Sequence, residues 1–82
     1  MSNTLLRLPS VKVESGYSRS TIYLRIAQGL WTRPVSLGAR CVAWPAAEVA
    51  ALNAARIAGK GEADIRALVT KLQAARALAQ QA

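Results

Sequence analysis

Residues 16–29, which read GYSRSTIYLRIAQG, gather hydroxyl and guanidinium side chains where a merely soluble helix would carry Glu and Lys. Four hydroxyl side chains lie in the first half of the stretch, and two arginines lie within it. Hydroxyl groups donate to phosphate oxygens or bind base edges, and arginine pairs bidentately with guanine. This set of side chains is therefore typical of a surface that contacts duplex DNA.

The spacing of the aliphatic residues predicts a helix over about residues 19–28. Ile22 and Ile26 lie one turn apart and mark its inward face, Ser18 suits the N-cap, and Gly29 suits the end. The opposite side then faces outward, as in helices whose N-terminal residues enter the major groove. The candidate DNA contacts on this helix are Ser18, Arg19, Ser20, Thr21, Tyr23, Leu24 and Arg25.

Several of these side chains have structural alternatives. Ser18 can serve as a helix cap instead of a base contact, and Tyr23 can pack on the following hairpin instead of touching phosphate. Arg19 and Arg25, each taken alone, can be solvated charges. Taken together with a helix-turn-helix geometry, the two arginines favour contact with DNA.

The residues before this helix predict a partner helix. Pro9 suits the first turn of a helix, and Gly16 suits the left-handed residue after its end, so a short helix is expected over about residues 9–15. Two helices joined by a short turn that contains glycine form a helix-turn-helix. Residues 5–8 hold three leucines, which can form an edge strand or a plug of the core.

The segment after the second helix predicts a β-hairpin with strands over residues 34–37 and 41–44 and a tip at 38–40. Arg33 precedes this hairpin and Arg40 lies at its tip, so the hairpin can act as a wing that reaches an adjacent groove of DNA. The alternative is a lid on the core. A third helix is expected to begin near Pro45, with Pro45 itself at an early helical position. The expected core residues of this part are Trp31, Cys41, Trp44, Val49, Leu52 and Ile57.

Gly59 and Gly61 separate an expected DNA-binding domain, residues 1–58, from a helical extension, residues 59–82, whose helix is expected over about 62–80. Apolar residues recur along this helix with the a-d spacing of a short coiled coil. The stripe can pack back on its own domain or grip a neighbouring copy. For the second alternative the candidate oligomerisation residues are Ile65, Leu68, Val69 and Leu72.

The charge balance favours a polyanionic partner. The 82 residues hold 11 Lys and Arg against 4 Asp and Glu, a formal net charge of +7.

Catalysis is not expected: the chain has no histidine and a single cysteine, Cys41, and Glu14 and Glu48 are not spaced as an acid–base pair. No cofactor or metal is expected. Neither a membrane span nor a signal peptide is evident, so the expected location is the cytoplasm, in association with the nucleoid.

The segments LLRLPSV, SRSTIY, Gly29, RPVSLG and WPAAEV, taken in order, resemble the AlpA family of prophage regulators over roughly residues 5–57. These small relatives of phage excisionases have a winged, MerR-like helix-turn-helix. The resemblance implies a mainly α fold with a small β-hairpin, followed here by a C-terminal helix beyond the usual end of the family. It also casts Ser20, Thr21 and Tyr23 as recognition-helix residues and Arg40 as part of the wing. The family usually has arginine at Leu24 and an apolar residue at Arg25, so the two are exchanged here.

For function, the resemblance implies a double-stranded DNA-binding protein of a prophage or integrative element. Such a protein acts as a transcriptional regulator, or as an excisionase (recombination directionality factor) that controls integrase-mediated excision. The implied partners are an attachment site or promoter, further copies on DNA and a tyrosine integrase. The alternative from a different class is a protein-interaction adaptor, for example in phage packaging or assembly, built on the same winged fold.

Overall fold

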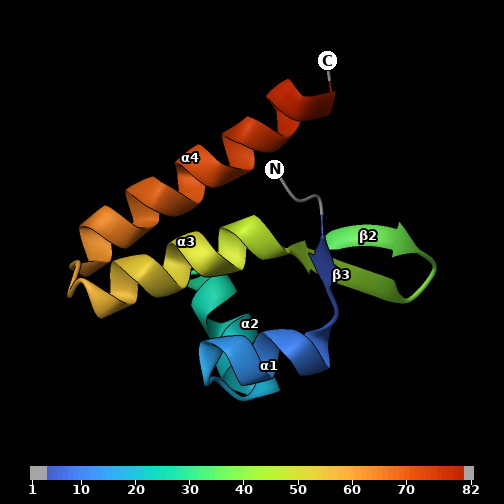
Figure 1. The fold of residues 1–82 in the computed structure, drawn as a ribbon, viewed down its shortest axis with the longest axis horizontal. Helices are drawn as coiled ribbons and strands as arrows, with labels where there is room; N and C mark the ends of the chain where they lie inside the picture. Colours follow the sequence, from blue (N-terminus) through green and yellow to red (C-terminus); the bar gives the residue numbers. More distant parts are fainter. Residues whose placement is uncertain (1–3, 81–82) are drawn as a thin grey trace.

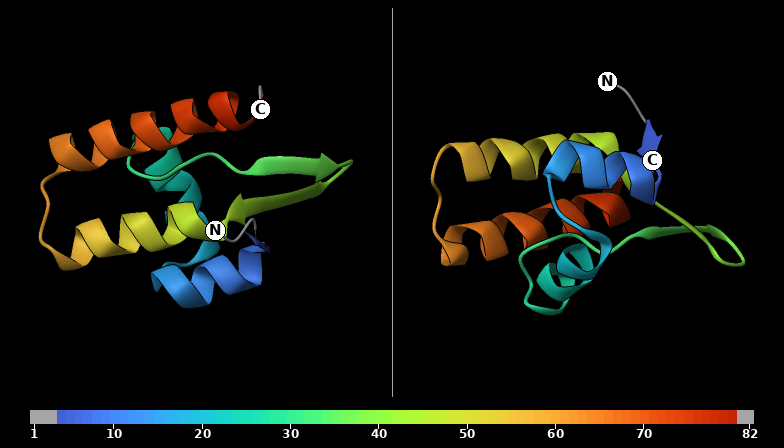
Figure 2. Two further views of the ribbon diagram at one scale, coloured as in Figure 1. Left: turned by 45° about the horizontal axis from the view of Figure 1, so that its top comes forward. Right: turned by 90° about the horizontal axis from the view of Figure 1, so that it is seen from below.

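The computed structural model describes residues 4–80 and has the winged helix-turn-helix fold that the sequence predicts. Helices α3 and α4 run side by side, α1 and α2 pack below them, and the hairpin β2–β3 projects from one end of the helical body (Figure 1; Figure 2). In chain order the elements are β1 (Leu5–Leu6), α1 (Leu8–Ser15), α2 (Arg19–Ala27), β2 (Val35–Gly38), β3 (Cys41–Pro45), α3 (Ala46–Ile57) and α4 (Glu62–Gln80).

The helix-turn-helix is built by the local signals expected of it. Pro9 lies in the first turn of α1, where a missing N–H costs nothing. Gly16 ends α1 with φ 76°, a left-handed conformation that glycine adopts without a steric penalty. The Ser18 side chain then caps α2 by accepting a hydrogen bond from the Thr21 N–H at 3.3 Å, so the predicted N-cap is confirmed.

The sheet joins β1, near the start of the described chain, to the two strands of the wing. Its order is β1-β3-β2, with both neighbours antiparallel to β3, and Leu6 lies opposite Trp44. Of the two alternatives for the leading leucines, the edge strand is therefore correct for Leu5 and Leu6. At the far end of the hairpin, Arg40 has φ 61°, in the left-handed region that L-residues other than Asn and Asp rarely occupy.

One hydrophobic core joins the helix-turn-helix, the hairpin and both later helices. Each member is at least 96% buried, and the predicted core aromatics Trp31 and Trp44 are confirmed among them. The core residues are Val11, Ile22, Trp31, Trp44, Val49, Leu52 and Val69.

Three expectations about packing are wrong. Ile57 is 87% exposed rather than inward-facing, since at about 100° per residue it lies well away from the stripe that holds Val49 and Leu52. Cys41 is half-buried rather than buried. Pro45 is the N-cap residue of α3 rather than an early helical residue, because it still belongs to β3, where it lies opposite Leu5.

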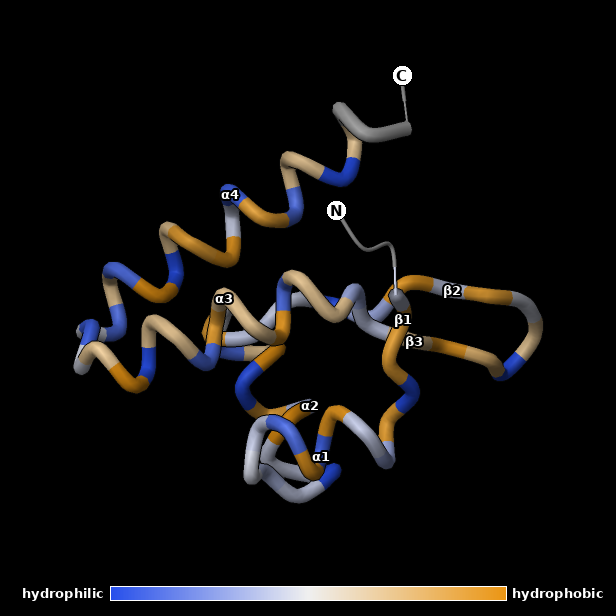
Figure 3. Tube along the Cα trace, in the orientation of Figure 1, coloured by the Kyte–Doolittle hydropathy of each residue, from blue (hydrophilic) through white to orange (hydrophobic). Residues whose placement is uncertain are grey.

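Helix α4 packs on its own chain. Val69 is 4% exposed within the core, and Ile65, Leu68 and Leu72 are half-buried against it. Apolar positions recur along the side of α4 that is nearer to α3 (Figure 3). Of the two alternatives for this stripe, packing on its own domain is therefore observed, while a further role of Ile65, Leu68, Val69 and Leu72 in oligomerisation stays a prediction. The division of the chain at residues 58 and 59 stays a prediction, since this core receives side chains from both parts.

Among residues 4–80, no helix combines the length and apolar content needed to cross a membrane.

Candidate nucleic-acid interface

The outward side of α2 presents polar groups and one apolar side chain. Ile22 is fully buried, whereas Ser20 is exposed, Leu24 is 52% exposed and Thr21 is half-buried. The structure thus places Ser20 and Leu24 on the face that sequence reasoning assigned to them. Of the two residues that are exchanged relative to the family, Leu24 is the one that faces outward, and Arg25 is half-buried.

The hydroxyl groups at the start of α2 form a local network. Ser18 donates to Thr21 Oγ1 at 2.9 Å, accepts from the Thr21 N–H at 3.3 Å, and lies 3.3 Å from Ser20 Oγ. A serine hydroxyl has one proton and two lone pairs, so these three contacts use all of its capacity. The cap is therefore the alternative that the geometry favours for Ser18, while the Thr21 hydroxyl keeps its own proton for an external acceptor.

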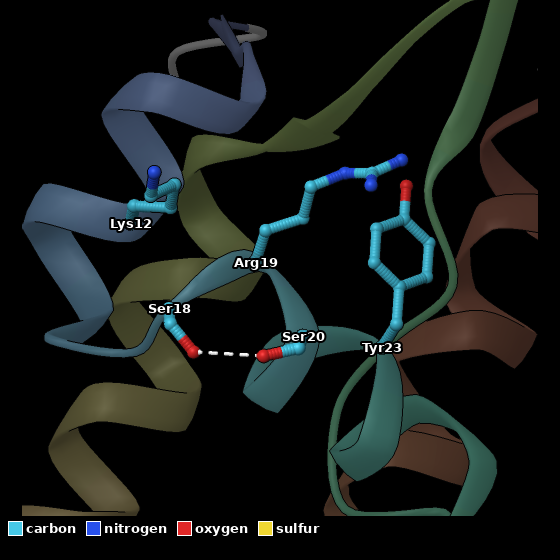
Figure 4. A pocket seen from close by; sticks show the side chains of 5 residues that line it. All are labelled: Lys12, Ser18, Arg19, Ser20 and Tyr23. Carbon is cyan, nitrogen blue, oxygen red and sulfur yellow. Dashed lines mark hydrogen bonds between the residues drawn. The ribbon is translucent and has the colours of Figure 1, made fainter.

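A cationic cleft opens beside this network. Its volume is about 540 Å³, and it is lined by Lys12, Ser18, Arg19, Ser20 and Tyr23 (Figure 4). Lys12 comes from α1 and is not among the DNA contacts predicted from the sequence, which lie on the second helix and the hairpin. Lys12 directly follows the buried Val11, which places it on the flank of α1 beside the core-facing side. This spacing is the sequence signal that indicates its position.

Tyr23 and Arg19 form a stack against the base of the wing. The Tyr23 ring meets the buried Trp44 edge to face, with centroids 6.3 Å apart, yet it remains 37% exposed. The Arg19 guanidinium lies 5.5 Å from the centroid of the Tyr23 ring, within cation–π range. Tyr23 therefore does pack against the hairpin, and this packing holds Arg19 at the mouth of the cleft.

Arg25 lies on the opposite flank of α2. It is half-buried, donates to Gln28 Oε1 at 2.9 Å, and lies 5.8 Å from the Tyr17 ring, which Arg56 covers more closely at 4.2 Å. These contacts hold Arg25 against its own chain and away from the Lys12–Arg19 cleft. The structure thus does not bring Arg25 together with the other candidates of α2.

The wing carries two exposed arginines at its two ends. Arg40 lies in the turn between β2 and β3, and Arg33 precedes β2. The base of the hairpin covers the core, since Ala43 and Trp44 are fully buried, whereas its far end is exposed. The hairpin therefore acts as a lid at its base and leaves its tip free.

The cations divide into two groups. Arg25, Arg56, Arg66 and Arg76 make hydrogen bonds within the chain. By contrast, within residues 4–80 the other cationic side chains make none and form no ion pair; these are Arg7, Lys12, Arg19, Arg33, Arg40, Lys60 and Lys71. Residues 16–47, which span α2 and the wing, contain four arginines and no acidic residue, a formal charge of +4. All four acidic residues lie outside this span.

A capped second helix with a polar outer side, an acid-free span and an arginine at the tip of a wing define a small winged helix-turn-helix protein. The family model described as Prophage CP4-57 regulatory protein (AlpA) matches residues 4–56. The chain therefore belongs to the AlpA family of prophage regulatory proteins, and the resemblance seen in the sequence is confirmed. The match runs from β1 through most of α3 and ends before α4.

A phage protein is similar over a comparable length of chain. The uncharacterized protein ORF88 of Enterobacteria phage P4 is 51% identical over 55 residues, which cover 67% of this chain and 62% of that protein. The chain thus spans about three-fifths of the length of this relative. No solved structure matches the chain.

Proposed function

We propose that this chain binds double-stranded DNA of a prophage or integrative element, where it acts as a transcriptional regulator or as an excision factor that directs integrase-mediated recombination. The observation that carries the proposal is the acid-free span 16–47, whose formal charge of +4 lies on α2 and the wing. Membership in a prophage regulatory family supports the same reading.

In the proposed complex, α2 lies in the major groove. Thr21 offers its hydroxyl proton to a base edge or a phosphate, and Ser20 offers hydroxyl lone pairs to an amino group on a base edge. Leu24 offers an apolar contact to a thymine methyl group. Lys12 and Arg19, on the two sides of the cleft, bind phosphates of the backbone, which position the protein on the duplex.

The wing supplies the second contact. Arg40 at the tip reaches the adjacent minor groove, where a narrow groove attracts arginine through its negative potential. Arg33 at the base of the hairpin binds the backbone between the two grooves. Arg25 has no part in this complex because its contacts hold it against Tyr17 and Gln28.

Regulator and excision factor need the same contacts, so the test is where the protein binds. Footprinting on the attachment region of its own element and on that element's promoters separates the two roles. Protection within the attachment region assigns excision, and protection confined to promoters assigns regulation. A scrambled duplex of equal length is the control, and the absence of any protected duplex at low ionic strength contradicts the proposal.

A role in protein interaction has one observation in its favour. Val13 on α1 and Ile57 at the end of α3 are 81% and 87% exposed, although both are aliphatic. A protein partner, such as a tyrosine integrase or a neighbouring copy on DNA, can cover such side chains. Assembly with a partner at moderate salt, without DNA, would support the adaptor alternative over the DNA-binding one.

A further inference from the structure

Helix α4 lies beyond the part of the chain that the family model matches, yet it contacts the segment that joins α2 to the wing. Arg66 Nε donates to the Gln28 carbonyl at 3.0 Å, just past the end of α2. Gln73 Oε1 accepts from the Arg33 N–H at 3.0 Å, and Arg76 Nη2 donates to the Arg33 carbonyl at 2.7 Å, just before β2. All three contacts are made to main-chain groups.

These three side chains form one row along α4. Residues 66, 73 and 76 are seven and three positions apart, which places them on one side of a helix, over a length of about 15 Å. The apolar seam that contains Val69 runs beside this row and fixes α4 on the core. The row therefore follows the connection from the end of the recognition helix to the base of the wing.

Arg76 is itself held in place. It donates to both carboxylate oxygens of Glu48 on α3, at 2.7 Å from Nε and 2.5 Å from Nη2, and Glu48 is only 6% exposed. A bidentate pair fixes the plane of a guanidinium group. The same Nη2 reaches Arg33, so α3, α4 and the base of the wing meet at one guanidinium.

Arg33 is consequently fixed through its main chain alone. Its N–H and its carbonyl are both bonded to side chains of α4, and its side chain is exposed and makes no hydrogen bond or ion pair within residues 4–80. Trp31 and Thr32 are buried and the Trp44 indole N–H donates to the Thr32 carbonyl at 2.9 Å, so the core fixes the segment up to residue 32 and α4 extends this order to Arg33. Without the bonds to α4, the main chain at Arg33 would have to be ordered when DNA binds, and that ordering would cost affinity.

We propose that α4 is a positioning element for DNA binding, in which Gln73 and Arg76 hold the wing at a fixed place relative to α2. This inference rests on the proposed function and adds to it a role for the helix outside the matched region. Gln73 and Arg76 act through Arg33 and the wing and make no contact with DNA themselves.

The test compares substitutions at Gln73 and Arg76, which both contact Arg33, with a control substitution on the same helix. Gln73→Ala removes one hydrogen bond, and Arg76→Lys keeps the charge but not the bidentate geometry. Lys71→Ala removes a charge from an exposed side chain of α4 that makes no hydrogen bond or ion pair in the described part of the chain. Affinity for a duplex from the element is measured by fluorescence anisotropy, after thermal unfolding shows that each variant is folded.

We expect Gln73→Ala to weaken binding by about fivefold, in line with the loss of one hydrogen bond, and Arg76→Lys to weaken it further. Lys71→Ala should have a smaller effect than either. In addition, the Arg33 amide should exchange its hydrogen faster in the Gln73→Ala variant, which links the loss of affinity to this segment.

A double-mutant cycle distinguishes positioning from general stability. If α4 acts through the wing, Arg40→Ala should weaken binding less in the Gln73→Ala background than in the unaltered protein. Additive effects, or unchanged affinity in folded Gln73→Ala and Arg76→Lys variants, would overturn the inference while leaving the proposed function intact. Failure of the unaltered protein to bind any duplex would overturn the proposed function, and the role of α4 with it.

Discussion

At the scale of single residues, the candidate interface depends on how Lys12, Arg19 and Tyr23 are held. Tyr23 stacks edge to face on the buried Trp44, and Arg19 lies over the Tyr23 ring, so a core aromatic indirectly fixes an exposed guanidinium. Lys12 faces the same cleft from α1 (Figure 4). Phosphate binding by these two cations would position the duplex without reading its sequence.

Substitution of Lys12 tests this cleft. We expect Lys12→Ala to weaken binding about threefold to tenfold on every duplex, and to lower the slope of log K against log salt by about 0.9, since one phosphate contact is lost. Lys71→Ala is the matched control, because it removes the same charge from the exposed side of α4. Equal losses in the two variants would show that only net charge matters and would contradict a specific role for the cleft.

The sequence predicted the roles of residues within α2 better than the contacts that α2 makes with neighbouring residues and elements. The Ser18 cap and the inward Ile22 follow from helical periodicity and capping preference, which act within one turn. Lys12 was missed because a cleft between two helices depends on how they pack, and Arg25 was assigned to DNA because its contacts with Tyr17 and Gln28 are not visible in a linear pattern.

At the scale of elements, the bounds of the helices and of the hairpin were predictable, because glycine and proline mark their ends. The placement of α4 was not. Its apolar stripe fits a neighbour as well as its own domain, and its three hydrogen bonds to the segment between α2 and β2 join residues 38 to 43 positions apart. Such contacts between side chains and distant main chain leave no periodic signal in the sequence.

The Arg76–Glu48 pair should stabilise the attachment of α4 to α3. We expect Glu48→Ala to lower the free energy of unfolding by about 2–3 kcal/mol, since it leaves a partly buried guanidinium without its partner. Glu62→Ala is the control, because the Glu62–Arg66 pair spans 3.7 Å at an exposed site and should contribute less than about 0.5 kcal/mol. Urea denaturation measures both, and similar losses in the two variants would contradict a structural role for the buried pair.

At the scale of the whole molecule, charge and packing are separated in space. The core draws on the helix-turn-helix, the hairpin, α3 and α4, whereas the acid-free span concentrates uncompensated arginines on α2 and the wing. The four acidic residues lie on α1, α3 and α4, and two of them pair with arginines of α4. A duplex would therefore meet the positive side of the molecule with little repulsion from carboxylates.

Contact of α2 and the wing with the duplex is tested most directly by measuring DNA binding across a salt series. The measurement compares the unaltered protein with the Arg19→Ala, Arg40→Ala double variant. The unaltered protein should bind its element's DNA with an affinity that falls steeply as salt rises. The double variant should bind more than about tenfold more weakly, with a slope smaller by about 1.8, because it lacks one cation of the cleft and one of the wing. Superimposable curves for the two proteins would contradict the claim that α2 and the wing contact the duplex.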